Sequence, residues 1–392
     1  MPHTPSKRGS RLLLLTELFP PAIGGRAVLF HGIYSRLRDA HVRVLTERRE
    51  PPSNSQPSGS FDIFPGAIAT KRWGLCHPLA LLHHLRVALQ IRRLASRRSV
   101  IHCARALPEG VGAMLCRLLG GPRYVCWAHG EDLALADGSR EYTWLTKLVY
   151  RHAEAALANS RNTADMLANL GTPREKIRLV YPAVDPDRFH PGVDGSAVRA
   201  RYAGPDDIML LSVGRLQRRK GHDVAIHAMA SLRHELPRLR YVIAGDGDER
   251  PRLEQLVKDE GLGDRVFFAG AISDDELPAH YAACDIFLLP NRIDNGDVEG
   301  FGIVFLEAAA SGKPVIAGNS GGVPEAVERD STGLLVDGAC VAEVAEAIRR
   351  LAFSETERQR LGAAGRVRAR DRFSWGSAAD TVGNLQAQLA AK

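Results

Sequence analysis

The sequence predicts an α/β protein made of two doubly wound domains in series, which face each other across a cleft. Three observations support this prediction. The chain has 392 residues, which is too long for one ordinary hydrophobic core. Short apolar runs alternate with helical stretches in both halves, as expected for parallel sheets wrapped by helices. A segment rich in Pro, Gly and Asp, residues 181–207, interrupts this alternation and marks the expected linker.

The short apolar runs give the expected strands of each half. In the first half they are residues 11–16, 41–46, 100–104, 124–128, 155–158 and 177–180. In the second half they are residues 208–213, 240–244, 266–269, 286–289, 314–317 and 333–336. Helical stretches such as 223–232 and 250–260 lie between strands, and residues 51–60 form a polar loop.

Composition is typical of a folded globular protein, with 45% hydrophobic and 25% charged residues. The apolar run at residues 12–15 follows basic residues, as in a signal peptide, but it is too short and Glu17 interrupts it. We therefore expect a buried strand there. The six cysteines are scattered without a CxxC pair, which favours reduced core thiols of a cytoplasmic protein over disulfides or metal ligands.

Positive charge is concentrated in the first half. Residues 1–195 carry 27 Lys and Arg against 16 Asp and Glu, whereas residues 196–392 carry 25 against 29. No acidic residue lies between Asp62 and Glu109. A helix is expected over residues 77–99 within this stretch. Its expected apolar face is Leu81, Leu85, Ala88, Leu89 and Ile91, and its basic residues are Arg86, Arg92, Arg93, Arg97 and Arg98.

This pattern predicts a helix that lies on an anionic membrane surface. The alternative is an ordinary domain helix with a solvated basic face. A nucleic-acid partner is not expected, because no binding motif is present and few aromatic residues are interleaved with the arginines.

Unusual polar residues follow the strands of the second half. Gly214, Arg215 and Lys220 follow the strand at 208–213, and Gly245 and Asp246 follow the strand at 240–244. Ligands of parallel sheets bind beyond the carboxyl ends of the strands. Arg215 and Lys220 could together neutralise a diphosphate without a metal, so no metal site is expected. Arg218 and Arg219, in the same loop, are interpreted as surface charge.

Two glutamates, Glu299 and Glu307, stand eight positions apart in the segment DVEGFGIVFLEAAASG. Glu307 is surrounded by apolar and small residues, where a carboxylate is costly unless something binds it. A carboxylate can accept hydrogen bonds from both hydroxyls of a ribose, and helix N-termini at 300–303 and 321–325 can bind phosphate or sugar oxygens. A glycosidase acid–base pair is disfavoured, because both carboxylates come from one loop–helix unit.

The first half offers fewer candidates. His129 follows the strand at 124–128 and is expected to point into the cleft. A single histidine is more often structural than functional, but the expected position of His129 in the cleft favours a functional role. Gly24 and Gly25 follow the first strand at loop distance, where backbone can approach a ligand closely.

Taken together, these motifs resemble glycosyltransferase family 4, the retaining transferases of the GT-B fold, over nearly the whole chain. The matching motifs are the E-x7-E pair Glu299 and Glu307, GR-x4-KG at 214–221, GDG at 245–247, GGVPE at 321–325 and HG at 129–130. Five motifs in the right order are a specific signal. The amino-acid sequence of residues 297–327 especially resembles that of bacterial phosphatidylinositol mannosyltransferases and their lipopolysaccharide- and exopolysaccharide-assembling relatives.

The resemblance implies two Rossmann-like domains. Residues 1–190 would bind the acceptor, residues 191–375 would bind a nucleotide-sugar donor, and a final helix, 376–392, would pack back on the first domain. Arg215 and Lys220 would bind the donor diphosphate and stabilise it as leaving group.

The remaining implied roles concern the nucleoside and the sugar. Glu307 would bind the ribose, and Glu299 would hold donor-sugar hydroxyls. His129 would contact the donor sugar near the reacting carbon. Gly24 and Gly25 would lie against phosphate or acceptor. Further donor contacts would come from Gly214, Gly245, Asp246, Gly300, Phe301 and Gly302.

The implied reaction is metal-independent transfer of a hexose, with retention, from a nucleoside diphosphate sugar to a lipid-linked or glycan acceptor. Mannose is the first expectation, then glucose or N-acetylglucosamine, and no further cofactor is implied. The enzyme would be cytoplasmic and peripheral on the inner face of the plasma membrane.

Two departures from the family pattern leave points open. Glu131 and Asp132 both follow the HG motif, so either could contact ligand, and the segment at 182–185 is shorter than the usual hinge. A nucleotide-sugar epimerase of the same architecture and an inactive sugar-nucleotide-binding module are the alternatives.

Overall fold

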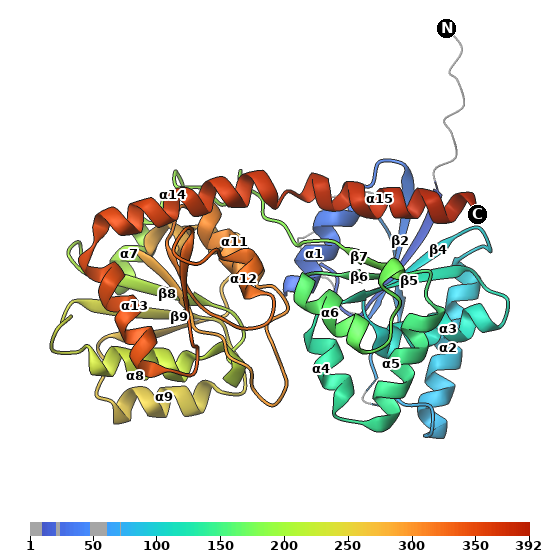
Figure 1. Cartoon of the computed structure of the whole chain (residues 1–392), viewed down its shortest axis with the longest axis horizontal. Helices are drawn as coiled ribbons and strands as arrows, with labels where there is room; N and C mark the ends of the chain where they lie inside the picture. Colours follow the sequence, from blue (N-terminus) through green and yellow to red (C-terminus); the bar gives the residue numbers. More distant parts are fainter. Residues whose placement is uncertain (1–9, 21–23, 48–60, 71) are drawn as a thin grey trace, which may run out of the picture. The chain divides into compact units, whose positions relative to one another are not determined.

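The computed structural model describes residues 10–20, 24–47, 61–70 and 72–392. The expected loop at 51–60 lies outside the described residues. The described chain divides into two compact units (Figure 1). Unit 1 comprises the described residues up to Pro182 together with Trp375–Lys392, and unit 2 comprises Ala183–Ser374.

Unit 1 is built on a parallel sheet whose described strands follow the order β3-β2-β1-β4-β5-β6-β7. The strands are β1 (Ser10–Thr16), β2 (Ala40–Glu47), β3 (Asp62–Gly66), β4 (Val100–Cys103), β5 (Arg123–Ala128), β6 (Ala155–Ala158) and β7 (Ile177–Leu179). The helices are α1 (Gly25–Tyr34), α2 (Pro78–Leu94), α3 (Val111–Leu118), α4 (Glu131–Asp137), α5 (Arg140–His152), α6 (Arg161–Asn169) and α15 (Trp375–Ala391). Short helical turns η1 (Ala106–Gly110) and η2 (Arg174–Lys176) complete the unit.

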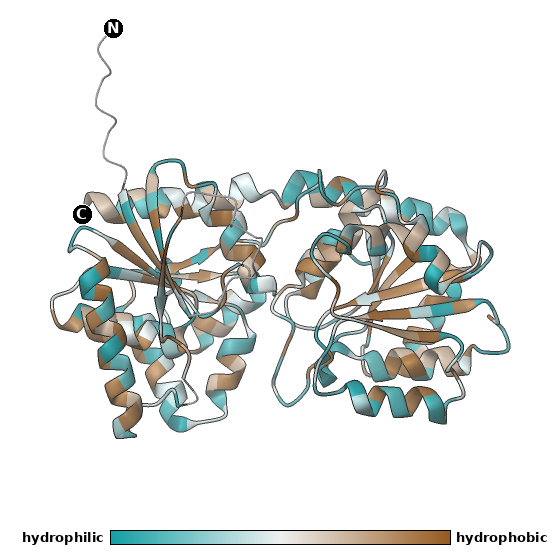
Figure 2. Ribbon diagram, turned by 180° about the vertical axis from the view of Figure 1, so that it is seen from behind, coloured by the Kyte–Doolittle hydropathy of each residue, from teal (hydrophilic) through white to brown (hydrophobic). Residues whose placement is uncertain are grey.

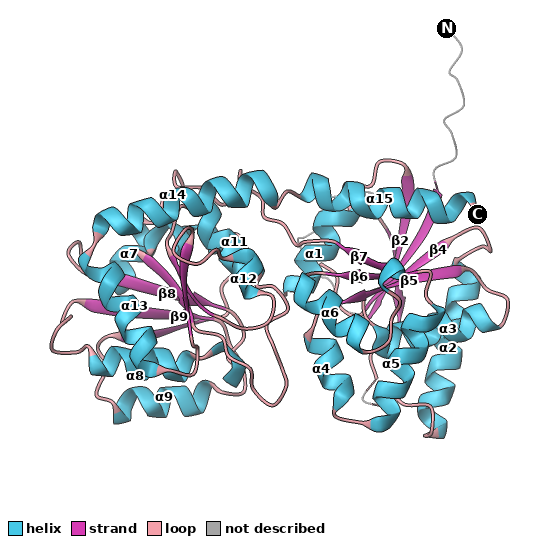
Figure 3. Ribbon diagram, in the orientation of Figure 1, coloured by secondary structure: helices cyan, strands magenta, loops and turns pink. Residues whose placement is uncertain are grey.

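Unit 2 repeats the plan with a parallel sheet in the order β10-β9-β8-β11-β12-β13 (Figure 3). Its strands are β8 (Ile208–Val213), β9 (Leu239–Ala244), β10 (Val266–Gly270), β11 (Ile286–Leu289), β12 (Val315–Gly318) and β13 (Gly333–Val336). Its helices are α7 (Ser196–Tyr202), α8 (His222–Ser231), α9 (Arg250–Asp259), α10 (Leu277–Ala283), α11 (Ile303–Ala310), α12 (Val323–Ala326), α13 (Val341–Phe353) and α14 (Glu355–Arg372), with the turn η3 (Arg218–Lys220).

The strands read as apolar runs because both faces of each sheet are covered by helices. In β1 all four leucines, residues 12–15, are at most 1% exposed. Leu13 and Leu15 belong to the core cluster that also holds Ile101 and Tyr124. Figure 2 shows the same contrast in both units, with brown strands inside and teal segments on the outer helices.

The predicted strands are confirmed, each to within one residue at both ends. Strand β3 was not predicted. It lies at the sheet edge and pairs only with β2, and it contains Pro65, which cannot donate to a ladder. An edge strand needs no apolar run on both faces, so its sequence carries a weaker signal.

The segment at 181–207 contains more structure than the predicted linker. The division between the units falls after Pro182, and Val184 forms a parallel bridge with Ser374. Phe189 is buried, and α7 occupies part of the segment. Most of the expected linker is therefore the beginning of unit 2.

The final helix, α15, returns the chain to unit 1 and packs on α1 and β1. Gly32 of α1 permits this contact, since a Cβ there would lie 2.6 Å from the Trp375 ring.

A buried polar chain also holds α15 to the sheet. The Gln386 amide donates to the carbonyl of Arg11, and its Oε1 lies 3.1 Å from His102 Nε2. Nδ1 of His102 lies 2.8 Å from the Tyr34 hydroxyl, which accepts from Trp127 Nε1 at 3.0 Å. Because Oε1 can only accept, Nε2 of His102 carries the proton and Tyr34 donates to Nδ1.

Helix α2 differs from its predicted form. It ends at Leu94, so Arg97 and Arg98 lie beyond it. Ala88 and Ile91 were expected on an apolar outer face, but both are buried because α2 packs on α3. Leu81, Leu85 and Leu89 are exposed, together with Arg86, Arg92 and Arg93. In the described part of the chain, no helix combines the length and the apolarity needed to cross a bilayer.

Candidate functional site

The carboxyl edge of the unit 2 sheet gathers most of the predicted site residues. Gly214 and Gly245 end β8 and β9 with φ values of 149° and 141°. A Cβ on Gly245 would lie 1.9 Å from the carbonyl oxygen of Gly214, so the two loops touch through their backbones. The nitrogen of Leu216 donates to Asp246 O at 3.0 Å. Only glycine allows this approach.

Glu299 is the centre of a buried charged cluster in this edge. Its Oε2 accepts hydrogen bonds from Arg219 Nη1 at 2.8 Å, from Asn291 Nδ2 at 3.0 Å and from Lys220 Nζ. Burial alone would raise the pKa of Glu299, but the charges of Lys220 and Arg219 lower that pKa to about 2. Glu299 is therefore a carboxylate at any physiological pH.

Arg219 corrects the sequence interpretation. It was expected to be surface charge, yet it is only 5% exposed and also pairs with Asp297 at 3.0 Å. Arg218 is exposed, as expected. The turn η3 explains the difference, because its successive side chains point about 120° apart, so that Arg218 faces solvent while Arg219 and Lys220 face inward. The following Gly221 lies so close to Pro290 O that a Cβ would be 2.0 Å away.

Glu307 has the opposite electrostatic character. It lies in the middle of α11, is 7% exposed and accepts a hydrogen bond from the Tyr281 hydroxyl at 2.7 Å. Burial raises the pKa of Glu307 to about 7, although the Tyr281 hydrogen bond and the charge of Arg188 oppose this. The two glutamates are therefore one permanent anion and one carboxyl that titrates near neutrality.

The glycine turn between the glutamates presents backbone rather than side chains. Gly302 caps α11 with φ of 89°, and the nitrogen of Gly322 donates to Glu299 O at 2.9 Å. Phe301 is 2% exposed and its ring packs on Phe373 at 5.5 Å between centroids. A ligand contact at Phe301 would therefore come from its backbone, as at Gly300 and Gly302.

Arg215 and Asp246 lie on the exposed rim of the same edge. Asp246 Oδ1 accepts from the nitrogen of Gly247 at 2.9 Å, and Arg250 Nη1 is 3.9 Å away. The two predicted diphosphate cations thus differ in setting: Lys220 is buried beside Glu299, and Arg215 is accessible.

In unit 1 the carboxyl end of β5 presents His129, which is 6% exposed. Its Nε2 lies 2.9 Å from Ala104 O, so this nitrogen carries the proton and Nδ1 is left as the acceptor. Burial lowers the pKa of His129, and the charge of Asp132 only partly opposes this. The ring stacks on Trp127 and meets Phe30 edge-on, which fixes its orientation.

The other candidate residues of unit 1 make different contacts. Asp132 Oδ1 accepts from the His129 backbone nitrogen at 2.9 Å, whereas Glu131 pairs with Arg26 at 3.9 Å. Gly24 precedes α1 with φ of 149°, and a Cβ on it would meet no atom within 4 Å. Gly25 is the first residue of α1.

Sequence reasoning missed one ionic cluster at the unit 1 edge. Arg105 is 8% exposed and donates from Nε to Glu109 Oε2 at 3.0 Å, and it also pairs with Glu17. Its guanidinium lies 5.4 Å from the Trp73 ring centroid. The available signal was position, since Arg105 closely follows β4 as His129 follows β5.

Two doubly wound units, one of which gathers cations, carboxylates and glycine turns at the carboxyl edge of its sheet, define the GT-B glycosyltransferase class. The chain belongs to this family of enzymes: residues 198–368 match the glycosyl transferases group 1 model, and residues 23–188 match the glycosyltransferase family 4 model. The predicted resemblance is thereby confirmed.

One relative is the GDP-mannose-dependent alpha-(1-6)-phosphatidylinositol monomannoside mannosyltransferase of Mycobacterium tuberculosis. It is 33% identical over 376 residues, which cover 93% of this chain and 95% of that protein. Among solved structures, sucrose-phosphate synthase from Thermosynechococcus elongatus has a TM-score of 0.82 at 24% identity, covering 97% of this chain and 99% of that chain. Anabaena Alr3699/HepE in complex with UDP and glucose has a TM-score of 0.79 at 21% identity, covering 96% and 99%.

The cluster around Glu299 generates a prediction about stability. Arg219→Met removes the ion pair between Arg219 and Asp297 and one of the two cations on Glu299, and breaking a buried pair in this way costs about 3 kcal/mol. The neighbouring Arg218→Met, on an exposed side chain, should change the free energy of unfolding by less than about 0.5 kcal/mol. Urea denaturation of both variants measures the difference.

The deficit of Arg219→Met should depend on pH. The lowered pKa of Glu299 contributes stability that is complete above its unfolded value and is lost as the pH falls toward 2. The gap between wild type and Arg219→Met should therefore narrow as the pH falls below about 5. Equal losses in both arginine variants would contradict a central role for Arg219.

Proposed function

We propose that this glycosyltransferase moves mannose from GDP-mannose to a lipid-linked acceptor, with retention and without a metal. The single observation that carries the proposal is the contrast between Glu299 and Glu307 at one sheet edge. Glu299 is a fixed anion beside Lys220, whereas Glu307 is a partly protonated carboxyl held by Tyr281. The names of the relatives, which specify GDP-mannose and phosphatidylinositol mannosides, support this choice of donor and acceptor.

The donor would be divided among these groups. The ribose diol donates to Glu307, and hydroxyls of the sugar donate to Glu299. Lys220 and Arg215 neutralise the diphosphate. In the reaction the bond between the anomeric carbon and the diphosphate oxygen breaks, and a bond to the acceptor oxygen forms on the same face. The leaving diphosphate takes the acceptor proton, so charge stabilisation by the two cations is the main catalytic contribution.

For His129 the proposed role is that of a neutral hydrogen-bond acceptor. Its lowered pKa keeps the imidazole uncharged at neutral pH, and its Nδ1 is the nitrogen not engaged with Ala104. A neutral acceptor suits a sugar hydroxyl. It would not attract the diphosphate, which is left to Lys220 and Arg215.

A peripheral membrane contact is proposed for the outer face of α2. Leu79, Leu82 and Leu89 are 63%, 42% and 54% exposed, and Arg86 and Arg93 are exposed beside them. Figure 2 shows brown segments along this helix. At the adjoining end of α3, Leu118 and Leu119 are 61% and 59% exposed. Exposed leucines flanked by arginines fit the interface of an anionic bilayer, where a lipid-linked acceptor resides.

Turnover should depend on Lys220. Lys220→Ala is expected to lower kcat by on the order of 100-fold, the scale for losing one preorganised charge stabiliser. Arg215→Ala should have a similar effect, while the exposed Arg218→Ala serves as the control. The assay follows GDP release and mannolipid formation from GDP-mannose and phosphatidylinositol mannoside. Abolition of activity by EDTA, with both variants near wild type, would disprove the metal-free mechanism.

Nucleotide affinity should depend on the protonation of Glu307. Ribose hydroxyls bind the carboxylate, so GDP affinity should fall as the pH drops from 8 to 6 through the raised pKa of about 7. Tyr281→Phe removes a hydrogen bond to the charged form and should shift this fall to higher pH. Glu307→Gln should bind GDP more weakly and retain only the titration of the diphosphate itself. Calorimetry measures the GDP affinity of the wild type and of both variants. An unchanged affinity in Glu307→Gln would return Glu307 to a structural role.

Membrane binding should require the arginines of α2. Each basic residue near an anionic leaflet contributes about 1 kcal/mol, so Arg86→Gln, Arg92→Gln and Arg93→Gln together should weaken binding on the order of 100-fold. Co-sedimentation with phosphatidylglycerol vesicles measures this, and high salt should release the wild type. The control neutralises three exposed arginines of unit 2, Arg201, Arg218 and Arg366. Equal binding to neutral and anionic vesicles would reject the contact.

A further inference from the structure

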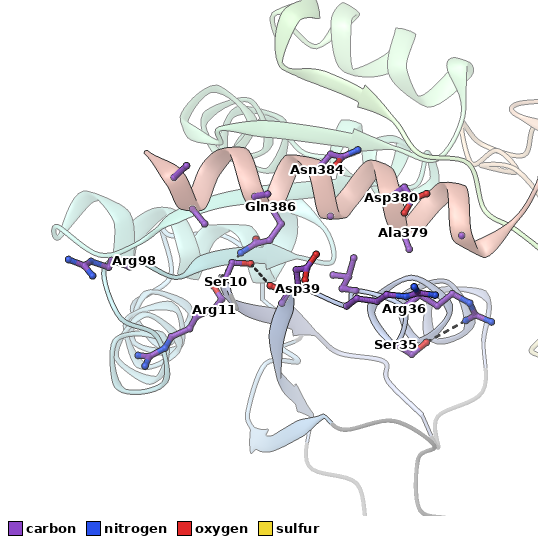
Figure 4. A pocket seen from close by; sticks show the side chains of 18 of the residues that line it. Ser10, Arg11, Ser35, Arg36, Asp39, Arg98, Ala379, Asp380, Asn384 and Gln386 are labelled. Carbon is purple, nitrogen blue, oxygen red and sulfur yellow. Dashed lines mark hydrogen bonds between the residues drawn. The ribbon is translucent and has the colours of Figure 1, made fainter. Parts of the chain in front are cut away.

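A groove of about 1700 Å³ lies within unit 1 between α15, the start of β1 and the loops that lead into β2 and β4. Figure 4 shows Ala379, Asp380 and Asn384 of α15 along one wall and Ser35, Arg36 and Asp39 along the other. The turn at residues 96–98 closes one end. The Ser10 hydroxyl donates to Asp39 O at 3.4 Å on the floor, which ties the starts of β1 and β2 together.

The groove is separate from the candidate catalytic edge. Ser10 begins β1 and Thr16 ends it, and seven residues of strand span about 20 Å. His129 follows the carboxyl end of the parallel strand β5, so it lies at the other edge of the sheet. A ligand in the groove would therefore not occupy the site of His129.

The lining of the groove is strongly basic. It contains Arg11, Arg36, Arg38, Arg97 and Arg98, against the two carboxylates Asp39 and Asp380. Arg36 donates from Nη1 to Gly32 O at 2.9 Å. Among the described residues, the side chains of the other four arginines form no hydrogen bond or ion pair.

Two arginines near the groove, in contrast, have partners for their side chains. Arg43 pairs with Asp62 at 3.6 Å and donates to Leu94 O at 2.8 Å. Arg123 pairs with Glu154 at 3.6 Å. In the described part of the chain, the guanidinium groups of Arg11, Arg38, Arg97 and Arg98 thus keep donors available that Arg43 and Arg123 have used. Several arginines with free donors around one hollow suit a ligand that carries several anionic oxygens.

Helix α15 keeps the groove open, because it presents small residues to it. Gly376, Ala379, Gly383 and Ala387 line this wall, and a Cβ on Gly383 would lie 3.5 Å from Leu37 Cδ2. The wall is also rigid, since Gln386 of the same helix is fixed to His102 and to the carbonyl of Arg11. Asn384 adds an exposed amide that can donate to an anionic oxygen.

We propose that this groove binds a phosphate-bearing anion, either a soluble phosphate ester or the headgroup of an acidic phospholipid. Both sources present the same chemistry, a phosphate group that can be bound by the guanidinium groups lining one groove. The groove adjoins α2, because the turn at 96–98 follows the helix directly, and a headgroup could enter from that side. The proposal does not depend on the identity of the sugar donor or the acceptor.

The test titrates inorganic pyrophosphate into the full chain carrying Lys220→Ala, a background that weakens the diphosphate site of unit 2. Saturable binding of one equivalent is expected. Arg38→Gln with Arg97→Gln should weaken it at least tenfold, because each guanidinium contributes charge-assisted hydrogen bonds. The matched control, Arg140→Gln with Arg151→Gln, neutralises two exposed arginines of α5 and should leave binding unchanged. Unchanged unfolding temperatures verify that each variant is folded.

Two further titrations identify the source of the phosphate. Glycerol phosphate and dihexanoyl phosphatidylglycerol share the phosphate but differ in their acyl chains. Tighter binding of the lipid, lost in the Arg38 and Arg97 double variant, supports a headgroup, and equal affinities support a soluble ester. Absence of saturable pyrophosphate binding, or equal weakening in the α5 control, would overturn the proposal.

Discussion

The site in unit 2 depends on one buried carboxylate, Glu299, and on the charges that keep it ionised. An isolated carboxylate in this position would be expensive, because burial removes its hydration. Lys220 and Arg219 from the loop after β8, with Asn291 after β11, replace the lost water. The loops must therefore fold together. Glycines at 221, 245 and 321 are needed because each allows the backbone of one loop to approach another, and Gly214 is favoured by its φ of 149°.

The same arrangement explains why two glutamates from one loop and helix behave so differently. Glu299 meets two cations, whereas Glu307 accepts a hydrogen bond from the Tyr281 hydroxyl and experiences the opposing charges of Arg188 and Asp274. The pKa values of the two carboxyl groups are about 2 and about 7. The carboxylate of Glu299 thus stays ionised across physiological pH, whereas the carboxyl group of Glu307 titrates within that range. Distinct environments thus give the two carboxyl groups of one sequence motif different protonation behaviour.

Unit 1 is organised around a series of hydrogen bonds between neutral side chains instead of a charged cluster. The chain from Trp127 through Tyr34 and His102 to Gln386 joins β5, α1, β4 and α15, and Trp127 stacks on His129. Burial lowers the pKa of His102 to about 4, which keeps its ring neutral and the direction of every hydrogen bond fixed. Helix α15 therefore has two roles. It supports the layer beneath His129 at one edge of the sheet, and it forms a wall of the basic groove at the other.

The sequence by itself determined the α/β architecture and the candidate site, because both have local signals. Central parallel strands are buried on both faces and read as apolar runs, and site residues follow those runs. Only the tertiary structure showed the features that depend on contacts between segments distant in the sequence. It placed Arg219 against Glu299 across 80 positions, divided the leucines of α2 between core and surface, and added β3 at an edge. The burial, the partners and the pKa of a side chain depend on which loops contact each other in the folded protein. Residue spacing within one segment does not predict those contacts.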